Sequence, residues 1–364
     1  MNGTPIDRRG EVLRFAAVYA LLPLLCLLCA VGIVLMQFVT SRIVFPEASL
    51  PLYRQLAVVN RAFAAEPNEE EQEGFSALLL SELDLPTGEL DALPEAPKGV
   101  YPIVTTTIPL GNGLINATDY SADLSVMASA TPMKQGEDDP CVLVLHTHAT
   151  ESFYDPDASP LSTVVMGQSA DVFGYYEEGL SPRSTDTEEN MVSVGRVFCE
   201  TLEEMGISTV HCETLHDLDY SQAYANSLSS AQEYLKKYPN IRYIIDLHRD
   251  SLVRDNGTKL KPTCTVDGKS TAQVMLVVGA GSKDLPQPGW KKNLAVTARY
   301  QSYLEQAGDG FARPVYLRYG RFNQHLSENT MLLEVGSCGN TLEEAQRAGK
   351  LAAEALGKMI LDAK

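Results

Sequence analysis

The sequence contains few basic residues. Its 29 lysine and arginine residues stand against 47 aspartate and glutamate residues, which gives a net charge of −18 at pH 7. Ten carboxylates and no basic residue fall within residues 66–97. Proteins that bind nucleic acid neutralise phosphates with basic patches, so this balance argues against nucleic acid as a partner. It sets no limit on an uncharged or mixed-charge substrate.

The sequence also lacks two motifs of cysteine and serine chemistry. The five cysteines after residue 140 show no C-x-x-C or other tight spacing, which argues against a structural zinc knot. No G-x-S-x-G motif is present, which argues against a serine nucleophile on a strained turn. The histidines lie instead among carboxylates, which is the pattern of metal ligands.

No charged residue occurs within residues 15–39, a run of 25 residues that is long enough to cross a bilayer with some tilt. Arg8, Arg9 and Arg14 precede it, so residues 1–14 are expected in the cytoplasm and the rest of the chain outside. A cleaved signal peptide is the alternative. The run is longer than a usual signal-peptide core and no clear A-x-A site follows, so we favour an uncleaved, single-pass transmembrane helix.

The remaining chain divides by composition. Residues 40–140 are acidic and interrupted by proline, which predicts a largely flexible extracytoplasmic linker. Residues 141–364 alternate between strand-like and helix-like segments, which predicts a catalytic α/β domain with a mostly parallel sheet and helices on both faces. We expect strands over 141–145, 207–212, 243–247, 272–279, 315–319 and 330–335, and helices over 188–205, 221–237, 290–307 and 341–361.

Three polar clusters follow apolar strands: HTHATES at 146–152, DLHRDS at 246–251 and LLEVGSCGN at 332–340. In open α/β sheets, ligands bind outside the carboxyl ends of the strands. These clusters are therefore expected to meet at one edge of the sheet.

Zinc hydrolases hold their metal with three protein ligands, often two histidines and one carboxylate. His148 and Glu151 are three residues apart and share one side if the chain turns helical after the strand. His248 would arrive from a neighbouring strand. His146 would face the same way as His148 if the strand continued, so either histidine is a candidate ligand. For these two histidines alone, a solvated strand end is the alternative.

Other residues of the clusters have expected supporting roles. Asp246 or Asp250 could accept the second imidazole N–H of His248. Arg249 could bind a substrate carboxylate or stabilise a developing oxyanion, unless the cluster is an ordinary ion-pair group.

Glu334 ends an apolar strand. If its side chain faces a metal, it would act first as general base and then as general acid in amide hydrolysis. The alternative is a strand-end carboxylate next to a helix start. The remaining histidines, His211, His216 and His325, are expected near the surface without a second partner.

The motifs HTHATES, DLHRDS and LLEVGSCGNTLEEA, together with NMVSVG and the N-terminal apolar segment, resemble the stage II sporulation protein P family of endospore-forming bacteria. That family resembles zinc-dependent N-acetylmuramoyl-L-alanine amidases. The resemblance implies an amidase-like fold and a Zn2+ cofactor. It also places Glu334 in an E-x-G-x-x-x-N setting that ends at Asn340. Asn340, together with Asp246, Asp250 and Ser251, is expected to bind substrate or to support the metal ligands.

The amidase register also implies another choice of carboxylate ligand. In those enzymes the ligand glutamate opens the first long helix, which here would be Glu188 or Glu189 instead of Glu151.

The resemblance further implies a function. The amide between the lactyl group of N-acetylmuramic acid and L-alanine of the stem peptide would be cleaved, with endopeptidase action on cross-links as an open addition. Implied partners are peptidoglycan, the membrane, stage II sporulation protein D and a stage II membrane scaffold protein, at the forespore septum during engulfment. Two alternatives are a zinc carboxypeptidase acting on stem peptides and a non-catalytic peptidoglycan-binding scaffold.

Overall fold

The computed structural model describes residues 100–130, 140–156, 172–177 and 182–363. The expected transmembrane segment and residues 40–99 of the expected linker lie outside these ranges. Within the described ranges, no helix is long and apolar enough to cross a membrane. All the described residues belong to one compact unit.

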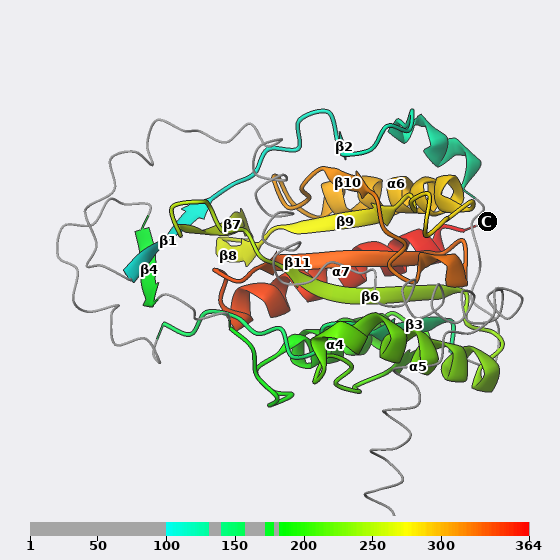
Figure 1. Ribbon diagram of the computed structural model, residues 1–364, viewed down its shortest axis with the longest axis horizontal. Helices are drawn as coiled ribbons and strands as arrows, with labels where there is room; N and C mark the ends of the chain where they lie inside the picture. Colours follow the sequence, from blue (N-terminus) through cyan, green and yellow to red (C-terminus); the bar gives the residue numbers. More distant parts are fainter. Residues whose placement is uncertain (1–99, 131–139, 157–171, 178–181, 364) are drawn as a thin grey trace, which may run out of the picture. The chain divides into compact units, whose positions relative to one another are not determined.

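Seven strands form the main sheet in the order β2-β10-β9-β11-β6-β3-β5 (Figure 1). Five of its strand pairs are parallel, and only β9 and β11 pair antiparallel. The expected mostly parallel sheet is thus confirmed. The strands span Leu114–Asn116 (β2), Val142–Leu145 (β3), Thr209–His211 (β5), Tyr243–Asp250 (β6), Val274–Gly279 (β9), Val315–Arg318 (β10) and Thr330–Ser337 (β11).

Helices cover both faces of this sheet, as expected. Val142 and Val144 pack in one core with helices α4 (Met191–Glu204), α6 (Trp290–Ala307) and α7 (Leu342–Leu361). Leu143 and Leu145 point the other way and pack with α5 (Ala223–Lys237). This alternation follows from the period-two geometry of a strand. Within the described residues there are also three short 3-10 helices: η2 (Leu124–Ser129), η4 (Tyr220–Gln222) and η5 (Gln324–Leu326).

A second, four-stranded sheet has the order β4-β1-β7-β8. Its strands are β1 (Val100–Thr106), β4 (Val172–Glu177), β7 (Lys259–Val266) and β8 (Lys269–Ala272). Strands β1 and β2 precede residue 141 and so lie within the range 40–140 that was expected to be a largely flexible linker. These strands gain their order from distant partners, because β1 pairs with β7 and β2 pairs with β10.

Side chains fix where the helices next to the site begin. The Asn190 side chain accepts a hydrogen bond from the backbone of Val192, so α4 begins at Met191 rather than at residue 188. Thr341 and Glu344 form a reciprocal capping box at the start of α7. The strand preceding α7 continues to Ser337, which places Glu334 inside a strand rather than at its end.

Candidate active site

Strands β6 and β11 bring His248 and Glu334 side by side, because the parallel register pairs these two residues directly. Ile244 of β6 and Leu332 of β11 face away from α4, α6 and α7. Residues two or four positions further along a strand point the same way, so His248 and Glu334 share this face. Both are buried.

His148 and Glu151 reach the same place from the turn after β3. The Glu151 amide donates to the His148 carbonyl oxygen at 3.2 Å, so the chain turns as the spacing predicted. The rings of His148 and His248 lie 5.3 Å apart between centroids, nearly perpendicular. Nδ1 of His248 lies 3.8 Å from Oε2 of Glu151. Two imidazoles and two carboxylates from three segments therefore lie together.

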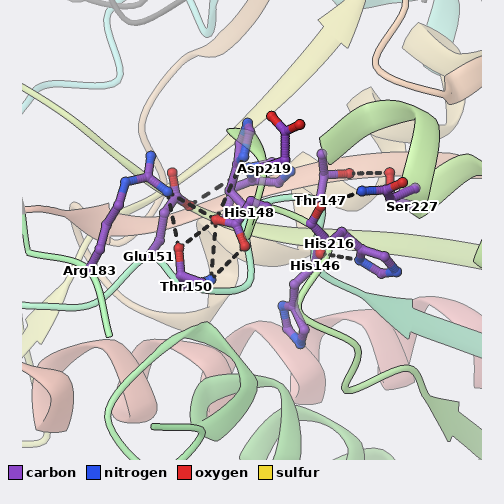
Figure 2. Close-up of polar contacts among 12 residues, drawn as sticks. His146, Thr147, His148, Thr150, Glu151, Arg183, His216, Asp219 and Ser227 are labelled. Atoms are coloured by element: carbon purple, nitrogen blue, oxygen red, sulfur yellow. Dashed lines mark hydrogen bonds and ion pairs between the residues drawn. The ribbon is translucent and has the colours of Figure 1, made fainter. Parts of the chain in front are cut away.

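His146 does not join this group. Its Nε2 lies 2.8 Å from Nε2 of His211, and a Cβ atom added to Gly195 of α4 would lie 2.5 Å from both rings. Figure 2 shows the His146 side chain pointing toward the helices, away from His148. The strand ends at Leu145, so the chain turns between the two histidines, and the condition under which they would share an orientation is not met.

The alternative carboxylates of the amidase register lie at the surface. Glu188 is exposed and pairs with Arg196. Glu189 is exposed and accepts a hydrogen bond from the Ser184 hydroxyl. Of the carboxylates considered as a third ligand, Glu151 alone lies beside His248.

Burial and neighbouring charges set the protonation of this group. Burial alone would lower the pKa of His248, but Asp246 and Glu151 outweigh it and raise that pKa to about 10. Burial raises the pKa of Glu334 to about 8. The charge of His248 opposes this rise, and the charge of Asp250 adds to it. Burial also lowers the pKa of His148 well below its usual value, which leaves this ring neutral. A neutral imidazole is the form that binds metals.

The residue types are those of a zinc site, but the side chains do not lie close enough together to form one. The separation of 3.8 Å between His248 Nδ1 and Glu151 Oε2 is close to the roughly 3.3 Å between two ligand atoms of one tetrahedral zinc ion. Oε2 of Glu334 is buried and has no hydrogen-bond partner. However, in the described part of the chain no three histidine, cysteine or carboxylate side chains are gathered closely enough to hold a metal.

The expected supporting residues differ in their contacts. Asp246 accepts hydrogen bonds from the backbone and hydroxyl of Thr147 and lies 3.1 Å from Nε2 of His248. Asp250 instead forms a buried ion pair with Arg313 at 2.8 Å. Asp246 is therefore the carboxylate placed to orient His248.

Two other expected site residues, Asn340 and Ser251, form hydrogen bonds that hold the loop after β11. The Asn340 side chain accepts from the Ser337 amide and donates to the Pro262 carbonyl oxygen. The Ser251 hydroxyl donates to Sγ of Cys338. These contacts close the loop and do not point to a substrate.

Arg249 does not present its guanidinium to the group. Its side chain is buried and donates to the carbonyl oxygens of Ser152, Pro182 and Asp250. Its backbone amide donates to Oε2 of Glu151 at 3.0 Å. The guanidinium thus joins backbone segments around Glu151, and a contact of Arg249 with substrate stays a prediction.

Several residues around His148 were not anticipated. The Tyr220 ring stacks on His148 at 4.6 Å between centroids, and Asp217 lies 4.0 Å from its Nδ1. His216 is buried and contacts the carbonyl oxygen of His146, so its expected surface position is wrong. The only available signal was the grouping of two histidines and three carboxylates in HCETLHDLD, directly after a predicted strand.

A family model described as stage II sporulation protein P matches residues 67–357. The chain belongs to that family. The family resemblance of its motifs is thereby confirmed. The chain is also 31% identical over 249 residues to stage II sporulation protein P of Bacillus subtilis (strain 168), over 65% of this chain and 55% of that protein. It therefore spans about half the length of this curated relative.

Solved structures with some similarity include N-acetylmuramoyl-L-alanine amidases. AmiC2 of Nostoc punctiforme is 12% identical, over 62% of this chain and 97% of its own, with a TM-score of 0.34. Ami1 from Mycobacterium abscessus is 13% identical, over 61% and 97%, with a TM-score of 0.33. The Clostridioides difficile CwlD amidase, solved in complex with the GerS lipoprotein, is 12% identical, over 61% and 98%, with a TM-score of 0.31. TM-scores of this size do not establish a common fold.

Proposed function

We propose that this member of the stage II sporulation protein P family is a zinc-dependent peptidoglycan hydrolase of the N-acetylmuramoyl-L-alanine amidase type. The observation that carries the proposal is the buried group of His148, Glu151 and His248 with Glu334 beside it on the neighbouring strand. Two imidazoles, one carboxylate and a separate carboxylate base are the side chains that metal-assisted amide hydrolysis requires.

Each residue of the group has a separate role in this proposal. A zinc ion held by His148, Glu151 and His248 would supply Lewis acidity to the substrate amide. Glu334 would take a proton from the attacking water and pass it to the leaving nitrogen. Asp246 would keep the His248 ring in place.

The proposed substrate is the amide between the lactyl group of N-acetylmuramic acid and L-alanine. Water adds to the carbonyl carbon, the C–N bond breaks and the nitrogen leaves as the amine of L-alanine. The location is a proposal too: residues 15–39 would anchor the chain and leave this domain outside the membrane. Stage II sporulation protein D and a stage II membrane scaffold protein remain expected partners from the family resemblance.

The test is digestion of purified cell-wall sacculi with the full chain in detergent. We expect release of stem peptides with a free L-alanine amino terminus, and loss of this release in Glu334→Gln with zinc content unchanged. General acid–base groups typically contribute about 10²–10⁴-fold to the rate, so we expect the hydrolysis rate of the variant to fall by a factor in this range.

Other products would support the alternatives. Release of terminal D-alanine alone would indicate a zinc carboxypeptidase. Binding to sacculi without release, or a folded chain without zinc, would indicate a scaffold and overturn the proposal.

A further inference from the structure

Arg183 brings a partly exposed guanidinium to the edge of the candidate site. It lies in the segment before α4, and its backbone forms an isolated antiparallel bridge with Glu151. Its guanidinium carbon lies 4.9 Å from the centroid of the Tyr220 ring, and that ring stacks on His148 at 4.6 Å between centroids. Figure 2 shows Arg183 beside Thr150 and Glu151. The guanidinium therefore lies next to the group proposed to cleave the amide.

One nitrogen of this guanidinium holds it in place. Nη1 donates to Oδ2 of Asp217 at 2.9 Å and to the Thr150 hydroxyl oxygen at 3.2 Å. The Asp217 side chain is fully buried and also accepts hydrogen bonds from the Thr150 amide and hydroxyl. A planar guanidinium that is fixed at one nitrogen has a defined direction for its other donors, so less entropy is lost when these donors bind a ligand.

The other donors of Arg183 have no hydrogen-bond partner in the described part of the chain. Nε and Nη2 make no hydrogen bond there, and Asp217 is the only described carboxylate that forms an ion pair with this side chain. The side chain is 28% exposed, so these donors can meet a ligand from solution. Nε and Nη2 point in parallel from one edge of the guanidinium, which is the arrangement that binds both oxygens of a carboxylate.

We propose that Nε and Nη2 of Arg183 bind a carboxylate of the stem peptide, which makes Arg183 a specificity-determining residue. The inference rests on the proposed function, because that function places a stem peptide beside the site. The glycan side of the scissile amide is uncharged, whereas the peptide side carries free carboxylates. Each extended residue spans at most about 3.5 Å, so a carboxylate on the residue after L-alanine can reach the guanidinium while the amide lies near His148. Arg183 would thus set the direction in which the stem peptide lies.

A purely structural role is the competing explanation, because Arg183 also ties its own segment to Asp217. Arg183→Gln removes the charge. Arg183→Lys keeps a charge that can pair with Asp217 but lacks the two parallel donors. Arg196→Gln is the matched control, because the Arg196 side chain is 29% exposed and pairs with Glu188 and Glu213 instead.

The experiment compares two soluble N-acetylmuramyl peptides as substrates of the full chain in detergent. One has a free carboxylate on the residue after L-alanine, and in the other this carboxylate is amidated. The measured quantity is the ratio of kcat/KM for the two peptides, which does not depend on the fraction of folded enzyme. A charged hydrogen bond typically contributes about tenfold or more to binding, so we expect a ratio of about ten in wild type and in R196Q. We expect a ratio near one in R183Q and an intermediate ratio in R183K.

The outcomes separate this inference from the proposed function. A ratio near one in wild type, the wild-type ratio in R183Q, or an equal fall of the ratio in R196Q would overturn the inference and leave the proposed function intact. If R183Q cleaves neither peptide, R183K decides, and the wild-type ratio in R183K would overturn the inference. If the wild-type chain cleaves neither peptide, the proposed function fails and this inference fails with it.

Discussion

The buried imidazole of His146 has a partner at each nitrogen. Nδ1 lies 3.1 Å from the carbonyl oxygen of Leu247, and Nε2 lies 2.8 Å from His211. Burial, and after it the charge of His211, lower the pKa of His146 well below its usual value. The ring is therefore neutral, with Nδ1 donating to Leu247 and Nε2 accepting from His211. Such a ring joins β6 to β5 and has no nitrogen left for a metal.

Replacing the two neighbouring histidines should therefore separate metal binding from stability. We expect His148→Ala to lose zinc because it removes a proposed ligand. His146→Ala should keep zinc, while its unfolding free energy falls by about 1–3 kcal/mol, because buried groups of Leu247 and His211 lose their partner. Metal analysis and urea unfolding of each purified variant check this. Zinc loss in His146→Ala with retention in His148→Ala would contradict the assignment.

Sequence reasoning left the choice between these histidines open for a physical reason. Their directions depend on whether the strand ends at residue 145 or continues to 148, and strand ends carry weak local signals. The positions of Glu334 and His248 were easier to predict, because each residue belongs to a long apolar strand whose existence the sequence predicts. Asp217 was not predicted, because its contacts with Thr150 and Arg183 arise from packing between two loops and a turn.

At the level of elements, helix α4 lies close to the strands at Gly195. A Cβ atom there would lie 2.5 Å from the rings of both His146 and His211. Alanine is favoured over glycine within helices by about 1 kcal/mol, yet overpacking costs typically about 1–3 kcal/mol. We expect Gly195→Ala to lower the unfolding free energy. Gly289→Ala is the control, because its Cβ would meet nothing within 4 Å, and an equal loss there would refute the crowding explanation.

The start of α7 contains a buried ion pair that should make stability depend on pH. Lys261 donates to Glu344 at 2.6 Å, and both side chains are buried. Burial alone would raise the pKa of Glu344, but hydrogen bonds from Lys261 and Ser270 outweigh it and hold that pKa below 4.5. The folded state thus binds fewer protons, so the pair stabilises the fold above pH 4.5 and this contribution is lost as pH falls.

We therefore expect the unfolding free energy to decrease on acidification below about pH 4.5, and Glu344→Gln to flatten this decrease. The variant should also be less stable at neutral pH, because the buried Lys261 ammonium loses its partner. Urea unfolding between pH 3 and 7 measures both effects. The same slope in wild type and variant would show that other groups control the acid response.

Elements with strong periodicity were predicted well, and α6 spans the expected residues 290–307. The β7–β8 hairpin was missed because it does not alternate between apolar and polar residues. Lys259 and Lys261 on β7 are buried, with their ammonium groups 3.6 Å from the ring centroids of Tyr176 and Phe173. Lysine stems can cover aromatic rings in this way, which hides an inward-facing position from a simple hydropathy pattern.

At the scale of the whole molecule, we expect residues 15–39 to hold the chain in the membrane. Their 25 residues without charge exceed the roughly 20 needed to span a bilayer. The full chain should sediment with membranes and resist extraction by high salt, whereas a chain lacking residues 1–40 should not. Release of the full chain by salt alone would contradict this prediction.

The central position of β11 has a consequence for how the molecule assembles. β11 lies between β9 and β6 and follows every other described strand in chain order. Until it inserts, the other strands form two separate blocks with open edges, and the Glu334 side chain is absent from its place beside His248. A chain that emerges from its amino terminus during synthesis thus gains its proposed catalytic group only when β11 inserts, and α7 completes the hydrophobic core after that step. Chains that end before β11 would lack the proposed general base, and we expect them to show no hydrolase activity.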